Sequence, residues 1–180
     1  MPEDQILINR APVLTLWGAV VAEKLGYDWD EALSLGQAMA GLNAQSKGRS
    51  LGIYGPPKGR EGDEPKKVGL GEELWVTLLG RHIPAKQTPE GLRAVTKDQP
   101  VDSARVARYL EGKFGDALAA AREAMEELAS ALGPEALEEE AFSLYEKFRP
   151  AIESGTRGWG QKGVLDLRKI RDLARPGSRA

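Results

Sequence analysis

Cationic side chains are concentrated in residues 45–70, where six Lys or Arg residues accompany three acidic ones. Gly and Pro recur through this segment, so we expect a long loop rather than a helix or a strand. Flexible cations can follow a phosphate backbone, and an aromatic ring among them can stack on a base. The residues predicted to bind nucleic acid here are Lys47, Arg49, Tyr54, Lys58, Arg60, Lys66 and Lys67. In the structural alternative, Lys47 and Arg49 interact with the dipole of a preceding helix, and the other charges keep the loop solvated.

A second stretch, residues 158–163 (GWGQKG), has the G-x-G-x-x-G spacing of dinucleotide-binding loops. That spacing binds a dinucleotide only where it follows a strand and opens the helix of a βαβ unit, whereas here it follows a predicted helix and Pro150. As an anion-binding turn, it would use backbone N–H groups at the start of the last predicted helix, with Arg157 and Lys162 beside them. As a structural turn, it would place Trp159 in a groove of the core or of an interface.

The sequence offers few side chains suited to catalysis or metal binding. There is no Cys and one His, so disulfides, thiol catalysis and zinc sites built from nitrogen and sulfur ligands are excluded. His82 lies between Arg81 and Ile83 on a predicted strand, without a nucleophile-elbow pattern, and is expected to be structural. The run 138–140 (EEE) points in several directions around a helix, so it predicts a solvated face. We find no P-loop, zincin or EF-hand pattern and expect no cofactor or metal.

Residues 18–42 resemble a helix-turn-helix, because A-x-x-x-G spacing at 22–26 places small residues where two helices touch. The residues that would approach DNA at the start of the second helix are Asp28, Asp30 and Glu31, which phosphate would repel. We therefore favour a helical hairpin that packs for stability.

The remaining segments predict elements that would position these groups. Helical spacing of apolar residues predicts helices over 12–25, 29–45, from 103 to 114, over 118–132, over 137–148 and from 166 to about 174. Strand formers and turn residues in 73–97 predict two or three short antiparallel strands.

Charge is segregated along the chain although the net charge is only −2. Residues 100–149 carry six basic and eleven acidic residues, and the tail from Asp166 carries five basic and two acidic ones. The N-terminus lacks the features of a signal peptide, and no apolar run is long enough to span a membrane, so we expect a cytoplasmic protein with no membrane partner. The absence of Cys and the abundance of Glu, Arg, Ala and Leu are typical of a thermophile.

Together these features predict a helix-rich α+β fold in one domain, 1–180. Its parts are an N-terminal helical hairpin (1–45), a basic Gly/Pro loop (46–71), a small antiparallel β element (72–99) and a C-terminal helical bundle (100–180). The leading functional hypothesis is a non-catalytic nucleic-acid-binding protein that uses the basic loop and the β-hairpin. One alternative is a protein–protein interaction or homo-oligomeric module, because the stripe at 118–132 and aromatic residues at 142–159 exceed what one core needs. Another alternative is an enzyme with a pocket near His82, Arg81 and Trp159.

Overall fold

The computed structural model describes residues 5–50, 73–96, 99–150 and 162–175, with the backbone alone for residues 43–50 and 73–74. The chain forms a helix-rich α+β fold, as the sequence predicts. In chain order, its elements are β1 (Gln5–Asn9), α1 (Arg10–Lys24), α2 (Trp29–Ser50), β2 (Glu73–Leu78), β3 (Arg81–Thr88), β4 (Gly91–Thr96), β5 (Gln99–Pro100), α4 (Ser103–Phe114), the 3-10 turn η1 (Gly115–Ala117), α5 (Leu118–Ser130), α6 (Pro134–Phe148), β6 (Lys162–Asp166) and α7 (Leu167–Leu173).

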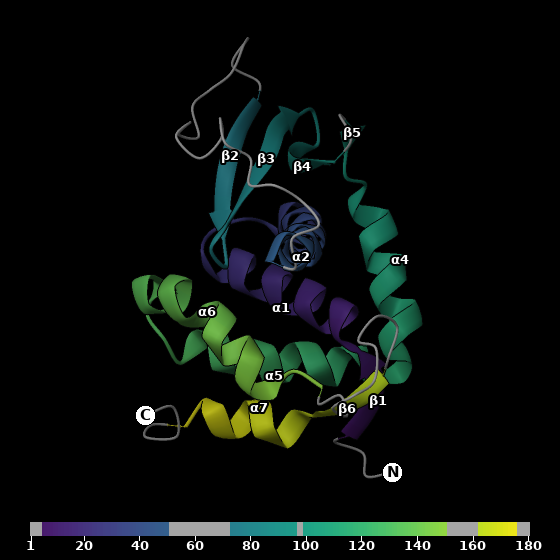
Figure 1. Cartoon of the computed structure of the whole chain (residues 1–180), viewed down its shortest axis with the longest axis vertical. Coiled ribbons are helices and arrows are strands. Elements are labelled where there is room, and N and C mark those ends of the chain that lie inside the picture. Colours follow the sequence, from purple (N-terminus) through teal and green to yellow (C-terminus); the bar gives the residue numbers. More distant parts are fainter. Residues whose placement is uncertain (1–4, 51–72, 97–98, 151–161, 176–180) are drawn as a thin grey trace.

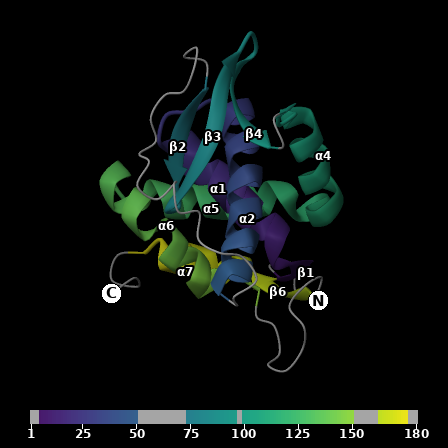
Figure 2. The ribbon, with the colours of Figure 1, turned by 45° about the horizontal axis from the view of Figure 1, so that its top comes forward.

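Helix α1 lies at the centre of the molecule (Figure 1). Its residues from Pro12 to Ala22 are all buried, so this helix is covered on every side rather than along one stripe. It packs on α2 on the side of the four-stranded sheet and on α5 and α6 on the opposite side, with α7 beyond α5 (Figures 1 and 2). The indole N–H of Trp17 donates a 2.9 Å hydrogen bond to the carbonyl of Ala141, which joins α1 to α6.

Two glycines bring the backbones of α1 and α2 into contact. A Cβ on Gly36 would lie 2.6 Å from the carbonyl oxygen of Thr15 and 2.8 Å from the nitrogen of Ala19, both in the backbone of α1. Gly18 faces the same crossing from the other helix. This close crossing is the helical hairpin that the sequence predicts at 18–42. Residues 32–36 of α2 are buried and Glu31 accepts a hydrogen bond from β4, which is the packing expected of a structural hairpin.

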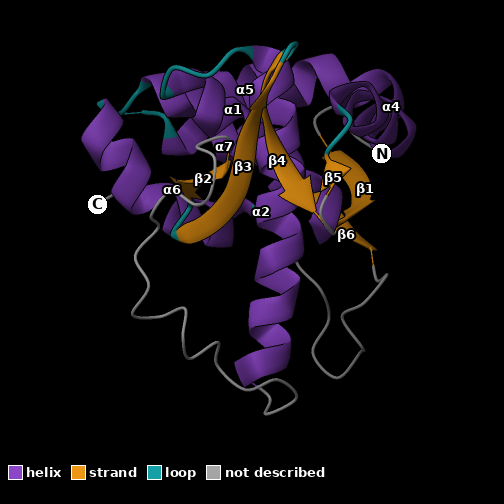
Figure 3. Cartoon of the chain, turned by 90° about the horizontal axis from the view of Figure 1, so that it is seen from above, coloured by secondary structure: helices purple, strands orange, loops and turns teal. Residues whose placement is uncertain are grey.

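Strands β2, β3, β4 and β5 form an antiparallel sheet in that order, which confirms the strands predicted in 73–97. The sheet lies against α2 (Figure 3), and Ile83 and Ala85 of β3 are buried. Side chains of α2 also accept hydrogen bonds from β4: Glu31 Oε2 from the N–H of Leu92 at 2.9 Å, and Ser34 Oγ from the N–H of Ala94 at 3.0 Å. These bonds satisfy amide groups that a strand edge would otherwise leave unpaired.

The sequence analysis did not predict strands β1 and β6, which pair antiparallel with Ile6 opposite Leu165 and Leu7 opposite Val164. The prediction that α2 ends near Gln45 was also wrong, because the helix continues to Ser50 and its C-terminal half runs out beyond the other described helices (Figure 3). A glycine inside a helix costs only about 1 kcal/mol, so Gly41 and Gly48 do not stop it. Residues 46–50 of the predicted loop are therefore helical.

Candidate functional site

The start of α1 and the end of α6 meet, although they are far apart in the sequence. The guanidinium Nε of Arg10 donates a 2.8 Å hydrogen bond to the carbonyl oxygen of Pro150, across 140 residues. The hydroxyl of Tyr145 lies 3.4 Å from the carbonyl oxygen of Arg10, which is long for such a bond. Arg149 directly follows α6 and precedes Pro150, so a second guanidinium-bearing residue lies at this junction.

The two guanidinium groups repel each other. Burial lowers the pKa of Arg10, the positive charge of Arg149 lowers it further, and Tyr145 opposes the shift. Among the described residues, neither arginine forms an ion pair with a carboxylate. A half-buried cation is normally paired, so two arginines without a carboxylate partner among the described residues leave an excess of positive charge at this junction.

Tyr145 does not neutralise that charge. Its side chain is buried between α1 and α6, and burial raises its pKa to about 12, against the opposing influence of Arg149 and Arg10. The phenol is therefore neutral at physiological pH. The guanidinium carbon of Arg149 lies 5.8 Å from the centroid of the Tyr145 ring, within the range of a cation–π contact that orients this arginine.

Strand β6 adds a third cation. Its first residue, Lys162, is exposed and lies opposite Asn9, the residue that precedes α1. We call Arg10, Arg149 and Lys162 the basic cluster. Donors on guanidinium and ammonium groups bind phosphate and carboxylate oxygens, so the cluster has the chemistry of an anion-binding surface.

Only part of the sequence-predicted site falls within the described residues. Lys47 and Arg49 lie in the last turns of α2, where the backbone alone is described. Lys162 is exposed on β6. The other predicted residues, Tyr54, Lys58, Arg60, Lys66, Lys67 and Arg157, lie outside the described residues.

The alternative of an anion-binding turn at 158–163 stays a prediction, because Arg157 and residues 158–161 lie outside the described residues. Helix α7 begins at Leu167, and the side chain of Asp166 caps it by accepting a 3.0 Å hydrogen bond from the N–H of Arg168. That carboxylate occupies the position an anion would take. Lys162 lies at the opposite end of β6, beside the start of α1 instead.

Sequence reasoning missed Arg10 and Arg149. One local signal was available for Arg10, because acidic residues are favoured in the first turn of a helix, whereas α1 begins with a cation and has no acidic residue there. Arg149 carries no such signal, since a cation after a helix C-terminus is common. Their proximity depends on the packing of α1 against α6.

The region around His82 does not form an enclosed site within the described residues. The His82 side chain is exposed, and its Nδ1 lies 3.0 Å from the Oγ1 of Thr77 on the neighbouring strand. Arg81 precedes it at the start of β3, and Trp159 lies outside the described residues. In this part of the chain, no group of three or more His, Asp or Glu side chains is placed to hold a metal ion.

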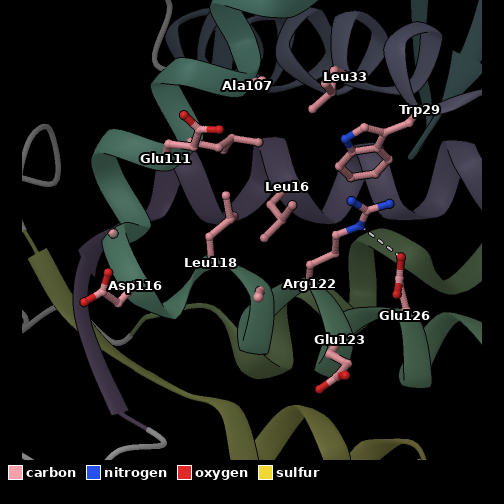
Figure 4. Close-up of a pocket in the computed structure, with 13 residues that line it drawn as sticks. Leu16, Trp29, Leu33, Ala107, Glu111, Asp116, Leu118, Arg122, Glu123 and Glu126 are labelled. Carbon is pink, nitrogen blue, oxygen red and sulfur yellow. Dashed lines mark hydrogen bonds and ion pairs between the residues drawn. The ribbon is translucent and has the colours of Figure 1, made fainter.

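A groove of about 630 Å³ opens between α2, α4 and α5, with α1 at its base (Figure 4). Leu16, Leu33 and Leu118 form its apolar floor, and four carboxylates stand around it, from Glu111, Asp116, Glu123 and Glu126. The basic cluster contributes to neither this groove nor a second cavity of about 570 Å³ between the β3–β4 turn and the start of α4.

The described residues define a helix-rich α+β protein with three cationic residues near the start of its central helix. Comparison of the chain with protein-family models, with curated proteins and with solved structures finds no match. No helix in the described ranges is both long and apolar enough to cross a membrane.

Proposed function

We propose that this protein binds the phosphate backbone of nucleic acid, without catalysis, through the basic cluster. The observation that carries this proposal is the junction of α1 and α6, where Arg10 is bonded to the carbonyl of Pro150 and Arg149 lies over the Tyr145 ring, and neither has a carboxylate partner among the described residues. A bound phosphate would offset the repulsion between them, so anion binding is favoured where the described residues supply no carboxylate to either arginine.

The openness of the cluster favours a polymer over a small anion. Small anionic ligands are usually held in concave pockets that bury most of their surface. Lys162 is exposed, and the two arginines are half-exposed. A chain of phosphates can contact such a surface while remaining largely solvated. The cations of the sequence-based prediction that lie outside the described residues stay part of the proposal on sequence grounds alone.

The test measures affinity for fluorescently labelled single-stranded DNA, single-stranded RNA and duplex DNA by anisotropy, in a salt series that starts at about 50 mM. We expect binding that weakens steeply as salt is raised, because counterions are released from each contacted phosphate. If none of the three probes binds at the lowest salt, the proposal is refuted.

Charge-reversal variants locate the surface. Lys162→Glu is expected to weaken binding by about tenfold and to flatten the salt slope, because one phosphate contact becomes a repulsion. Arg108→Glu is the matched control, since Arg108 is an exposed cation on α4 and its reversal changes the net charge equally. Equal loss of affinity in the two variants would show that net charge, rather than the basic cluster, governs binding.

A further inference from the structure

Strand β4 carries a buried arginine without an acidic partner. Arg93 is only 8% exposed, although charged side chains are seldom buried unless they are paired. Among the described residues it forms no ion pair, and its one hydrogen bond runs from Nη1 to the carbonyl oxygen of Leu92 at 2.9 Å. Glu31 approaches the same turn, but its two carboxylate oxygens accept hydrogen bonds from the backbone N–H groups of Asp28 and Leu92. Arg93 therefore holds a buried positive charge that pairs with no carboxylate in this part of the chain.

The remaining donors of Arg93 are available to a cavity. Arg93 lines the cavity of about 570 Å³ between the β3–β4 turn and the start of α4 (Figure 1). Its Nε and Nη2 have no acceptor among the described residues, and neither atom is fully buried. These two atoms form one edge of the guanidinium, which can donate two parallel hydrogen bonds to a carboxylate. The volume lies within the range of about 300–1,000 Å³ that is usual for small-molecule sites.

A second cation lies beside Arg93. Lys86 of β3 is directly opposite Arg93 in the register of the two strands, so both side chains leave the same face of the sheet. Lys86 is half-buried, lines the same cavity and forms no ion pair with a described side chain. On its other side Lys86 lies opposite Glu73 of β2, for which the backbone alone is described. Because like charges directly opposite each other destabilise a sheet, an anion bound between Lys86 and Arg93 would offset their repulsion.

The two carboxylates that line this cavity are more exposed than its cations. Glu90 lies on the β3–β4 turn and Asp102 precedes α4, and both are exposed. Asp102 caps α4 by accepting a 3.1 Å hydrogen bond from the N–H of Ala104, so the helix N-terminus is not open to a ligand. The positive charges are thus buried or half-buried, whereas the negative charges lie at the rim. This order favours a ligand with one anionic group, placed at Arg93, and disfavours a second anionic group near the rim.

From these observations we infer that the cavity binds a small molecule through a single carboxylate, which accepts hydrogen bonds from Arg93 and Lys86. The part of the ligand near Glu90 and Asp102 is neutral or cationic, because a second negative charge there would be repelled. The same repulsion disfavours dianionic phosphate relative to a carboxylate. None of the cations of the basic cluster lines this cavity, so the inference does not depend on nucleic-acid binding.

The test uses short aliphatic compounds of equal chain length that differ in charge: butyrate, 4-aminobutyrate, succinate and 1,4-diaminobutane. Each compound, and inorganic phosphate, is titrated into the full chain to about 50 mM at constant ionic strength, and amide chemical shifts report binding. We expect butyrate and 4-aminobutyrate to shift amides around Arg93 saturably, succinate to bind about fivefold more weakly, and 1,4-diaminobutane not to bind. Absence of saturable shifts with both monocarboxylates would overturn the inference, as would binding of succinate or phosphate as tight as that of butyrate.

Variants of the two cations locate the carboxylate. Arg93→Gln removes the guanidinium and is expected to weaken butyrate binding about tenfold. The matched control is Arg108→Gln, at an exposed position of α4 outside the cavity, which should leave the affinity unchanged. Equal affinity in these two variants would overturn the inference. If Arg93→Gln does not fold, Lys86→Gln takes its place with an expected loss of about threefold, and unchanged affinity in that variant would overturn the inference.

A rim variant tests the order of charge separately. Glu90→Gln removes one carboxylate from the rim and is expected to raise the affinity for succinate about threefold while changing the affinity for butyrate much less. Glu139→Gln on α6 is the control, since it removes an exposed carboxylate away from the cavity. Unchanged succinate affinity in Glu90→Gln, or an equal gain in the control, would overturn the inference.

Discussion

The close crossing of α1 and α2 predicts that Gly36→Ala destabilises the protein. In a solvent-exposed helix, replacing Gly with Ala stabilises by about 1 kcal/mol. At Gly36 the added methyl would lie 2.6 Å from the carbonyl oxygen of Thr15 and 2.8 Å from the nitrogen of Ala19, well inside normal contact distance. Both atoms belong to the backbone of a buried helix, so no side chain can turn away. Overpacking of this kind costs about 3 kcal/mol, which leaves a net loss of about 2 kcal/mol.

The same helix supplies the control. Gly41 is exposed, and a Cβ there meets nothing within 4 Å, so Gly41→Ala should stabilise by about 0.5–1 kcal/mol. Urea unfolding, followed by far-ultraviolet circular dichroism and tryptophan fluorescence, gives both free energies at an unchanged m-value. For a chain of this size, the Gly36 variant should lose about 4–8 °C in Tm. A Gly36→Ala protein at least as stable as the wild type would refute the close backbone contact.

Three further variants test other parts of the core. Burial raises the pKa of Tyr145 to about 12, so the unfolding free energy should be fully retained below pH 10 and fall by about 2–3 kcal/mol as the pH rises to 12. Parallel denaturant titrations of Tyr145→Phe should lack this loss. Ser34→Ala leaves the buried N–H of Ala94 without its acceptor and should cost about 1–3 kcal/mol in urea unfolding; a loss below about 0.5 kcal/mol would contradict this. Trp17→Phe removes the N–H that donates to the carbonyl of Ala141 and leaves a cavity, so it should cost about 2–3 kcal/mol, and an unchanged urea midpoint would count against that hydrogen bond.

Local periodicity predicted the helices whose buried apolar residues recur at each turn. Apolar spacing in α5 predicted both the helix and its buried face, and Met125 and Leu128 are buried as expected. The hairpin of β2 and β3 could also be predicted from the sequence, because its turn at Leu79–Gly80 lies between two runs of strand formers. In both cases the signal is local, a spacing or a turn, although the buried face of α5 packs on α1 and α7, which are distant in the sequence.

Strands β1 and β6 show where such reasoning fails. Each has five residues, and neither has a nearby partner: Ile8 pairs with Gly163, at the other end of the chain. A short apolar run is compatible with a strand, a turn or a helix end, and the pairing that decides between them is non-local. The β1–β6 pairing places Lys162 beside the start of α1, and the packing of α1 on α6 brings Arg10 to the end of α6. Both contacts are non-local, so the sequence indicated Lys162 as a candidate but not the residues beside it.

The segregation of charge offers a way to test whether the basic cluster or the total charge of the chain governs nucleic-acid binding. A protein with a net charge of −2 attracts a polyanion only if its cations are gathered in one place, because its field at long range is slightly repulsive. Reversing two carboxylates of the groove, as in Glu111→Lys with Glu123→Lys, moves the net charge by four units without touching the basic cluster. If local geometry governs nucleic-acid binding, that variant should gain little affinity at about 150 mM salt, where fields are screened beyond about 8 Å. If the affinity gained by this variant is as large as the affinity lost by Lys162→Glu, the total charge of the chain governs nucleic-acid binding and the basic cluster does not.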